Sequence, residues 1–564
     1  MHDLVIRGGT VVDGSGAPGV VADVAVRDGR IVAVGASPGA AHREVDARGR
    51  LVTPGFVDIH THYDGQATWD SALTPSSWHG VTTAVFGNCG VGFAPLKPGS
   101  ADYLINLMQG VEDIPEAVLA EGIDFAWEGF AEYLGALQRR AHAIDFAAQL
   151  PHAALRFYVM GERGADHRAR PTGAELQSMT ALTRRALMDG ALGVSTSRTP
   201  KHRAADGRPT PSLSADAPEL LALAEGLRQA GRGVLQVNSD FGPGEFELLR
   251  QAAQHAHRPL TVLLLQMDRE PDLWRRTLAQ IHAARDAGIE ATGQVGAKAI
   301  GVLMGLDASR HPFQDHPDWA PLADMTGAQA AAWLSAHPDV ATRLVADDRP
   351  DTPANRALRR MVERSFVIDA DFDYEPPMSA SLGERARREG TTVWKLALDA
   401  LRQHNGTGLL MHPFENYSAG SLDVVREMLQ DPATVMGLAD AGAHVGLICD
   451  AAAPTFLLQH WARDRRRGPR LPLEFLVHKQ TRATALAYGL ADRGLVAPGM
   501  KADLNVIDFE TLGLHRPQVV RDLPAGGKRL IQRARGYSYT FVSGVEILRD
   551  DELTGELPGQ LVRG

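Results

Sequence analysis

The sequence predicts an α/β fold: a (β/α)8 TIM barrel, a small β-sandwich domain built from both termini, and an inserted lid segment. Three observations support this prediction. Short runs of alternating apolar and polar residues near both ends are typical of β-hairpins. Between them, short apolar strands alternate with helical stretches rich in Ala, Leu and Arg, which indicates a parallel sheet. One long stretch interrupts that alternation.

The two terminal segments are expected to form one domain. In the first, the apolar runs 24–26 and 31–34 flank the turn Asp28-Gly29, which is a hairpin signal. In the last, Ser543-Gly544 joins the runs 539–542 and 545–547. We therefore predict a composite β-sandwich domain from residues 1–53 and 496–564.

The central segment, residues 54–495, contains the strand and helix units that favour a barrel. It is longer than the roughly 250 residues of a bare barrel, so we expect an insertion. The best candidate is about 307–400, where Asp, Arg, Pro and His surround short helical pieces and the strand rhythm disappears. A lid over the C-terminal face of the barrel is the natural use of such an insertion.

Composition points to a small-molecule or peptide substrate. The 68 acidic and 58 basic residues give a net charge of -10 without a single-sign excess, so neither nucleic acid nor an anionic membrane is an expected partner. No basic start leads into an apolar segment, and no apolar run reaches the roughly 18 residues of a membrane span. Two cysteines are too few for a disulfide framework. We predict a soluble, cytoplasmic protein.

The sharpest local signal is a pair of histidines in the run Val57-Asp58-Ile59-His60-Thr61-His62. Alternation along a strand puts His60 and His62 on one face, where two imidazoles can ligate one metal ion. The bare pattern is weak in a chain with 21 histidines. Its context is more specific, because the pair ends a strand that begins with Pro54-Gly55 and follows the terminal hairpins.

This context resembles the amidohydrolase superfamily, whose members open a metal-binding barrel with such a segment after a small β-domain shared by the two termini. The segment 494–504 resembles the superfamily's return to that β-domain. The run Gly87-Asn88-Cys89-Gly90-Val91 is similar to a segment of the N-acyl-D-amino-acid deacylases, where cysteine replaces the usual carbamylated lysine as a metal ligand. The resemblance implies that Cys89 is a ligand, against the alternative of a buried structural cysteine. Cys449 is interpreted as packing.

Three further segments resemble barrel strands of these deacylases. Residues 151–156, which include His152, are similar to the third strand and its loop, and residues 190–197 are similar to the fourth. Residues 436–442 resemble the last strand, where the superfamily carries a catalytic aspartate. Asp440 is therefore predicted as catalytic residue and metal ligand. The alternative is an aspartate that caps a helix or shapes a turn.

The fifth and sixth strands depart from the family pattern. The deacylases carry a histidine on each, for a second metal position. Here residues 233–240 and 260–267 place Asn238 and Gln266 at or near those positions. Carboxamides are poor zinc ligands, so we predict one zinc ion, bound by His60, His62, Asp440 and Cys89 with a water position open. Alternative ligands of a second site are His255, His257, His412 and His444.

Several polar residues near the strand ends are candidates for substrate binding. Arginine can grip a substrate carboxylate with two hydrogen bonds, although a basic run after the fourth strand is also compatible with a merely solvated surface. His412 follows an apolar strand and either faces the site or caps the core. The predicted substrate-binding residues are His152, Arg198, His202, Asn238, Gln266, Lys298 and His412.

The predicted reaction is metal-assisted hydrolysis of an amide bond. The cation lowers the pKa of a bound water toward about 7 and polarises the carbonyl, while Asp440 takes the water's proton and passes it to the leaving amine. The resemblance implies an N-acyl-D-amino acid or similar small acylamine as substrate, and a homo-oligomer. Alternatives are hydrolysis of a cyclic amide or another amide natural product, and a degenerate barrel that binds ligand without catalysis.

Overall fold

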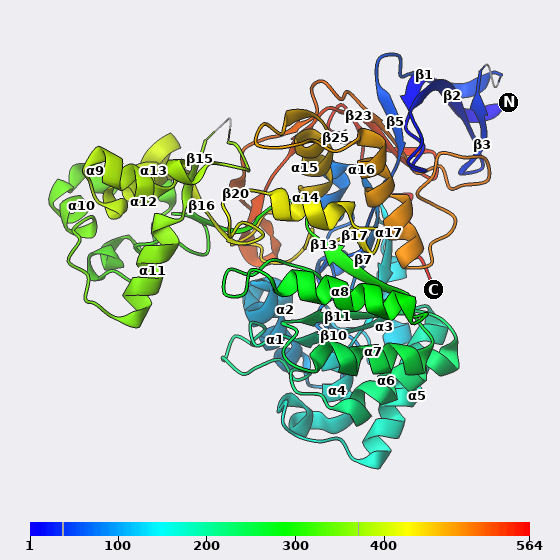
Figure 1. Cartoon of the computed structure of the whole chain (residues 1–564), viewed down its shortest axis with the longest axis horizontal. Coiled ribbons are helices and arrows are strands. Elements are labelled where there is room, and N and C mark those ends of the chain that lie inside the picture. The colour runs from blue at the N-terminus through cyan, green and yellow to red at the C-terminus, as the bar shows by residue number, and fades with distance from the viewer. Residues whose placement is uncertain (37–38, 370–371) are drawn as a thin grey trace.

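The computed structural model describes residues 1–36, 39–369 and 372–564 and is a mixed α/β protein with parallel strands at its centre (Figure 1). One sheet pairs its strands in the order β6-β7-β8 and another in the order β17-β13-β12-β11-β10-β9. Their pairings are parallel, which confirms the prediction from the alternation of strands and helices. The strands are β6 (Phe56–Asp58), β7 (Val81–Phe86), β8 (Asp145–Ala148), β9 (Leu150–Pro151), β10 (Gly193–Arg198), β11 (Val234–Ser239), β12 (Leu260–Leu263), β13 (Ala291–Val295) and β17 (Thr434–Met436).

The two parallel sheets are neighbours at both of their edges. Thr61, just after β6, forms a parallel bridge with Ala441, which follows β17. At the other edge, Gln149 separates β8 from β9 and its N–H donates to the carbonyl of Phe86 on β7 at 2.9 Å. The carboxyl ends of β6, β7 and β17 therefore lie close together.

Helices connect the parallel strands, and their sequences explain where they begin and end. Thr172 accepts a hydrogen bond from the Glu175 N–H at 3.3 Å in a capping box at the start of α5. That helix ends at Gly190, whose φ of 119° suits glycine. The helices are α1 (Ala101–Glu112), α2 (Glu116–Gly122), α3 (Phe130–Arg139), α4 (His152–Met160), α5 (Gly173–Asp189), α6 (Ala217–Ala230), α7 (Glu245–Ala256), α8 (Leu273–Asp286), α14 (Asp423–Gln430), α15 (Ala453–Phe456), α16 (Leu473–Gln480) and α17 (Arg482–Ala487).

The two ends of the chain share one sheet, with β25-β24-β23-β18-β5-β1-β2-β3 in order and β4 paired to β1. Its junction is the antiparallel pair β5–β18, with Val52 opposite Val506. The predicted pairing of the two terminal segments is confirmed, while the domain limits 1–53 and 496–564 stay a prediction. The strands are β1 (His2–Val11), β2 (Val20–Arg27), β3 (Arg30–Gly35), β4 (Ala41–Asp46), β5 (Leu51–Pro54), β18 (Leu504–Ile507), β23 (Tyr537–Val542), β24 (Val545–Arg549) and β25 (Glu552–Leu553). Two hairpin-like pairs accompany this sheet: β19 (Gly513–Leu514) with β22 (Ala534–Arg535), and β20 (Gln518–Leu523) with β21 (Gly527–Ile531).

A helical lobe lies to one side of the parallel strands, at the left of Figure 1. It has its own apolar core, in which Trp394, Leu344 and Leu401 are buried. An antiparallel sheet, β14-β16-β15, connects the lobe to the rest of the chain. The lobe falls largely within the predicted insertion at 307–400, although α13 continues to Gly406, and its use as a lid stays a prediction. Its elements are β14 (Ile300–Gly305), α9 (Gly327–Ala336), α10 (Pro338–Leu344), α11 (Pro353–Glu363), β15 (Phe366–Ile368), α12 (Leu382–Glu389), α13 (Val393–Gly406) and β16 (Leu409–Glu415).

Within the described part of the chain, none of the helices combines the length and the apolar character that crossing a bilayer requires.

Candidate metal centre

Three potential metal ligands converge at the carboxyl ends of β6 and β7. The ligand atoms of His60, His62 and Cys89 all lie within 4.8 Å of one another, and the three side chains are buried. The Cys89 Sγ is 3.4 Å from the His60 Nε2. Two imidazoles and a thiol in a buried space are a donor set that zinc prefers.

The loop that presents Cys89 depends on its glycines. Gly87 has a φ of 75°, and a Cβ there would approach the carbonyl oxygen of Gln149 to 2.4 Å. Gly90 has a φ of 69° and lies as tightly against the backbone of β10, with Ser197 N only 2.7 Å from such a Cβ. The loop can therefore turn sharply at the end of β7 only without side chains at these two positions.

Asp440 completes the cluster from the segment after β17. Its Oδ1 lies 3.3 Å from the His60 Nε2 and 3.7 Å from the His62 Nε2, and its N–H donates to the His60 carbonyl at 3.1 Å. Burial opposes ionisation of this carboxyl, but the hydrogen bond from His62 and the charges of both histidines hold its pKa below the usual range. Asp440 is therefore an ionised carboxylate at neutral pH.

Carboxamides from the neighbouring strands hold two of the ligands. The His60 Nδ1–H donates to the Gln294 Oε1 at 2.6 Å, which leaves Nε2 with its lone pair toward the cluster. Burial lowers the pKa of His60 to about 4, so its neutral, metal-binding form predominates. The Cys89 N–H donates to the Gln236 Oε1 at 3.0 Å. Each amide thus hydrogen-bonds a non-ligating atom of a candidate ligand residue and orients that residue.

The Nδ1 of His62 faces a carboxylate rather than an amide. Its Nδ1 lies 3.4 Å from the Glu112 Oε1, and the His444 Nε2 lies 3.7 Å from the Glu112 Oε2. Burial would lower the pKa of His62, but Glu112, Asp440 and Cys89 raise it well above the usual value. For Cys89 itself, burial raises the thiol pKa to about 11. A bound cation would favour the thiolate and the neutral imidazole instead.

Three of these supporting residues were missed in the sequence. Gln236 and Gln294 carry a signal in retrospect, because each is a polar residue inside a strand that is otherwise buried. Glu112 carries none: it ends an amphipathic helix, and no spacing relates it to His62.

Two predicted substrate-binding residues lie against the cluster. The Asn238 Nδ2 is 3.6 Å from the Cys89 Sγ and donates to the His202 Nε2 at 3.3 Å. The other ring nitrogen of His202 is 2.9 Å from the Ser197 Oγ. Burial, followed by the positive charges of His444 and His62, lowers the pKa of His202 to about 3. His202 is thus a neutral imidazole beside the metal ligands.

Four other predicted substrate-binding residues are held by different partners. Arg198 forms an ion pair with Glu245 on α7. The Gln266 Oε1 accepts from the Ser418 N–H at 3.2 Å. Lys298 lies 3.0 Å from an oxygen of Asp450 and 5.1 Å from the Tyr374 ring centre. His412 pairs with Val302 across β16 and β14, the sheet that leads to the helical lobe. Their roles toward a substrate stay predictions.

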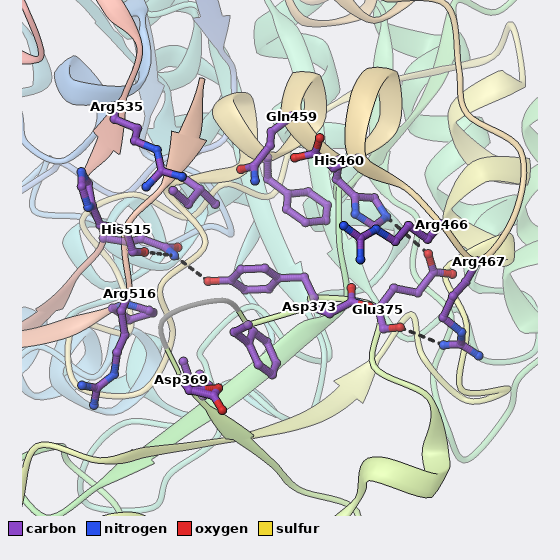
Figure 2. Close-up of a pocket in the computed structure, with 18 residues that line it drawn as sticks. Asp369, Asp373, Glu375, Gln459, His460, Arg466, Arg467, His515, Arg516 and Arg535 are labelled. Carbon is purple, nitrogen blue, oxygen red and sulfur yellow. Dashed lines mark hydrogen bonds and ion pairs between the residues drawn. The ribbon is translucent and has the colours of Figure 1, made fainter. Parts of the chain in front are cut away.

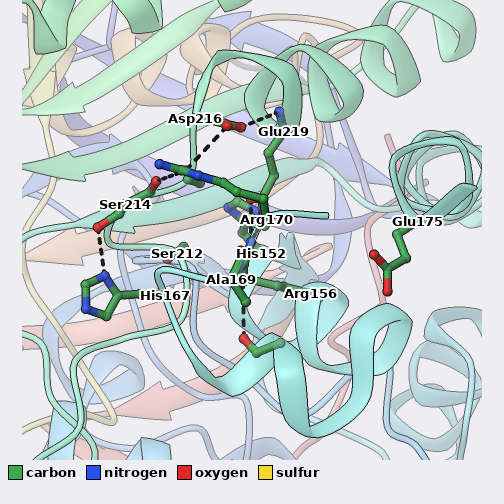
Figure 3. A network of polar contacts seen from close by, with 12 residues as sticks. His152, Arg156, His167, Ala169, Arg170, Glu175, Ser212, Ser214, Asp216 and Glu219 are labelled. Carbon is green, nitrogen blue, oxygen red and sulfur yellow. Dashed lines mark hydrogen bonds and ion pairs between the residues drawn. The ribbon is translucent and has the colours of Figure 1, made fainter. Parts of the chain in front are cut away.

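His152 belongs to a buried polar network (Figure 3). Its Nδ1 lies 2.9 Å from the Thr196 Oγ1, and its Nε2–H donates to Glu219 at 3.0 Å. Glu219 also forms an ion pair with Arg156. Both ring nitrogens of His152 therefore have protein partners, so a contact with substrate would have to displace one of them.

A cavity of about 540 Å³ lies apart from the metal ligands (Figure 2). It opens between the loop after β15, helix η6 (Leu457–Asp464) and the C-terminal strands. Its lining mixes cations such as Arg466 and Arg535 with carboxylates such as Asp373 and Glu375, and includes none of His60, His62, Cys89 and Asp440.

Comparisons with known proteins found a family model and several relatives that match most of the chain. A model of the Amidohydrolase family matches residues 43–547. The D-aminoacylase of Alcaligenes xylosoxydans xylosoxydans is 27% identical, over 99% of this chain and 97% of its own length. A structure of D-aminoacylase, described in terms of one-metal activation and second-metal attenuation by its binuclear metal centre, superposes with a TM-score of 0.65 at 26% identity over the whole of both chains. N-acyl-D-glutamate deacylase from Bordetella bronchiseptica, complexed with zinc and a phosphonate inhibitor that mimics the tetrahedral intermediate, has a TM-score of 0.65 at 25% identity over the same coverage.

Proposed function

The chain belongs to the amidohydrolase family, and from that premise we propose that it is a metal-dependent hydrolase that cleaves the amide bond of N-acyl-D-amino acids or similar small acylamines. The observation that carries this proposal is the convergence of the buried His60, His62 and Cys89 with the partly buried Asp440. Relatives named D-aminoacylase and N-acyl-D-glutamate deacylase, similar over nearly their whole length, support the substrate class.

The architecture proposed for this activity is a (β/α)8 barrel at 54–495, with a terminal β-domain and a lid at about 307–400. The order of the parallel strands and the bridge between Thr61 and Ala441 support closure of the barrel. All four clustered residues follow the carboxyl ends of strands, the face on which barrel enzymes carry their active sites.

The centre is proposed to hold one zinc ion through His60, His62, Cys89 and Asp440. When bound there, zinc supplies a nucleophilic water at neutral pH and polarises the scissile carbonyl. Asn238 and Gln266 support a single ion, because a carboxamide is a weak zinc ligand beside imidazole and thiolate. The similar D-aminoacylase structure, described in terms of one-metal activation and second-metal attenuation, supports the proposal of a single activating ion.

The chain's own residues are proposed to move the proton and orient the substrate. Asp440 accepts a proton from the attacking water and delivers it to the nitrogen of the leaving amine as the C–N bond breaks. The products are a carboxylic acid and a free amine. His202 and Asn238 lie beside the ligands, and we propose that the amide or carboxylate of the substrate replaces the hydrogen bond between them. We also propose a cytoplasmic location.

A hydrolysis assay tests the proposal. Zinc-loaded protein is incubated with a panel of N-acyl-D-amino acids, their L enantiomers, cyclic imides and aryl amides, and the released amine is quantified. We expect turnover of the D series above the others. Turnover confined to cyclic imides would indicate a cyclic amide as the substrate instead. No turnover with zinc bound would favour a ligand-binding protein without catalytic activity.

A further inference from the structure

The carboxyl group of Glu112 lies in an unfavourable place. It is the last residue of α1, where the helix dipole disfavours a negative charge. Its side chain is 1% exposed, and neither carboxylate oxygen has a hydrogen-bond partner among the described residues. Burying a carboxylate without compensation is costly, so the histidines beside it must provide that compensation.

Those histidines are arranged to do so. The His62 Nδ1 faces the Glu112 Oε1 at 3.4 Å, while the His62 Nε2 faces Asp440 on the other side of the ring. The His62 Nδ1 has no hydrogen-bond acceptor among the described residues, so Glu112 is its nearest ionic neighbour in the structure. A closer approach of a few tenths of an ångström would make a charge-assisted hydrogen bond.

The backbone holds this carboxylate in place. The His444 N–H donates to the Glu112 carbonyl, and the Gly446 N–H donates to the Asp113 Oδ2 at 3.1 Å. These bonds tie the end of α1 to the loop that follows Asp440. Glu112 is therefore fixed relative to both His62 and the catalytic carboxylate.

We propose that Glu112 is the positioning residue of the metal centre: it accepts the Nδ1–H of His62 and thereby directs the His62 Nε2 lone pair to the metal. This inference rests on the proposed function. A carboxylate behind a ligand histidine fixes its tautomer and raises its basicity. His60 has a neutral amide in the same place, so His62 is the stronger donor of the two.

The test is the zinc dissociation constant of Glu112→Gln, measured by competition with a chelator of known affinity. We expect affinity to fall by about 10- to 100-fold, while the unfolding midpoint of the metal-free protein changes little, because the variant keeps the shape and loses a buried charge. Glu116→Gln, on an exposed residue of the next helix, is the matched control and should bind as wild type does. Affinity of Glu112→Gln within twofold of wild type would overturn the inference.

A second measurement needs no variant. In zinc-loaded protein with 15N-labelled histidine, nuclear magnetic resonance should show the proton of His62 on Nδ1 and the metal on Nε2. The opposite assignment would overturn the role of Glu112 even if the variant does not fold. Wild-type protein that binds no zinc would instead refute the proposed function itself, so the two failures are distinguishable.

Discussion

The carboxyl ends of the parallel strands divide into two regions with different chemistry. The ligand arc, at the ends of β6, β7 and β17, presents ionisable side chains, namely His60, His62, Cys89 and Asp440. The amide arc, on β11 and β13, presents Gln236, Asn238 and Gln294. Imidazole, thiolate and carboxylate are good zinc ligands, whereas carboxamides are weak ones. Two of the amides hydrogen-bond His60 and Cys89, so the amide arc supports two residues of the ligand arc.

Removal of the metal is the largest test of this division. Dialysis against a strong chelator should abolish hydrolysis, and about one equivalent of zinc per chain should restore it. Activity and zinc content are measured on the same samples. If full activity survives in protein shown to be free of metal, the ligand arc has no catalytic role.

Asp440→Asn should separate binding from proton transfer within the ligand arc. Asparagine keeps the shape of the side chain but cannot accept the proton, so kcat should fall by about 10²- to 10⁴-fold. We expect zinc to remain bound through His60, His62 and Cys89. Steady-state kinetics and metal analysis check both outcomes, and a variant as fast as wild type would exclude Asp440 as the base.

Asn238→His should add a metal ligand to the amide arc. The Asn238 side chain reaches to 3.6 Å from the Cys89 Sγ, so an imidazole there would add a good zinc donor beside a thiolate. Zinc content should rise from about one toward about two ions per chain, while Asn238→Leu stays at one. Two ions in wild-type protein would show that the amide arc already binds metal.

Gln294→Leu should weaken the support of His60 without removing a ligand. The lost bond is between neutral groups, which is weaker than a charge-assisted one. Zinc affinity should therefore fall by about 10-fold, less than for Glu112→Gln. Parallel chelator titrations of the two variants compare their losses of zinc affinity. A loss for Gln294→Leu that equals or exceeds the loss for Glu112→Gln would contradict the expected order.

The smallest effect on the metal is expected from a buried ion pair outside both arcs. Glu375 binds Arg465 through contacts of 2.9 and 3.0 Å. Burial opposes its ionisation, but His460 and Arg465 outweigh this and lower the pKa of Glu375 from 4.5 to about 2. The pair should stabilise the fold fully above pH 4.5 and lose its effect as the pH falls toward 2.

Denaturant unfolding of the metal-free protein checks this expectation. The free energy of unfolding of wild type should exceed that of Glu375→Gln at neutral pH, with the difference shrinking between pH 4.5 and 2. Zinc affinity should be equal in the two proteins. A difference that does not depend on pH would mean that shape, not charge, explains the role of Glu375.

Local patterns in the sequence predicted part of the ligand arc, namely the two histidines. A period of two predicted that His60 and His62 share a face, and the structure places them together just after β6. Alternating runs at both ends predicted the terminal strands, and in the structure Val52 on β5 pairs with Val506 on β18. Each of these signals spans only a few residues, so it can be recognised in the sequence from the side-chain period of a strand alone.

The neighbours of the ligands were decided by tertiary structure. Glu112 meets His62 because α1 packs its last turn against the loop after Asp440, and Gln294 meets His60 because β13 lies beside β17. Arg198 turned to Glu245 on α7, a partner that no local pattern revealed. The sequence by itself predicted the candidate metal ligands: strand period indicated His60 and His62, and resemblance to the deacylases implied Cys89 and Asp440. The packing of distant elements decided which carboxylates and carboxamides contact those ligands.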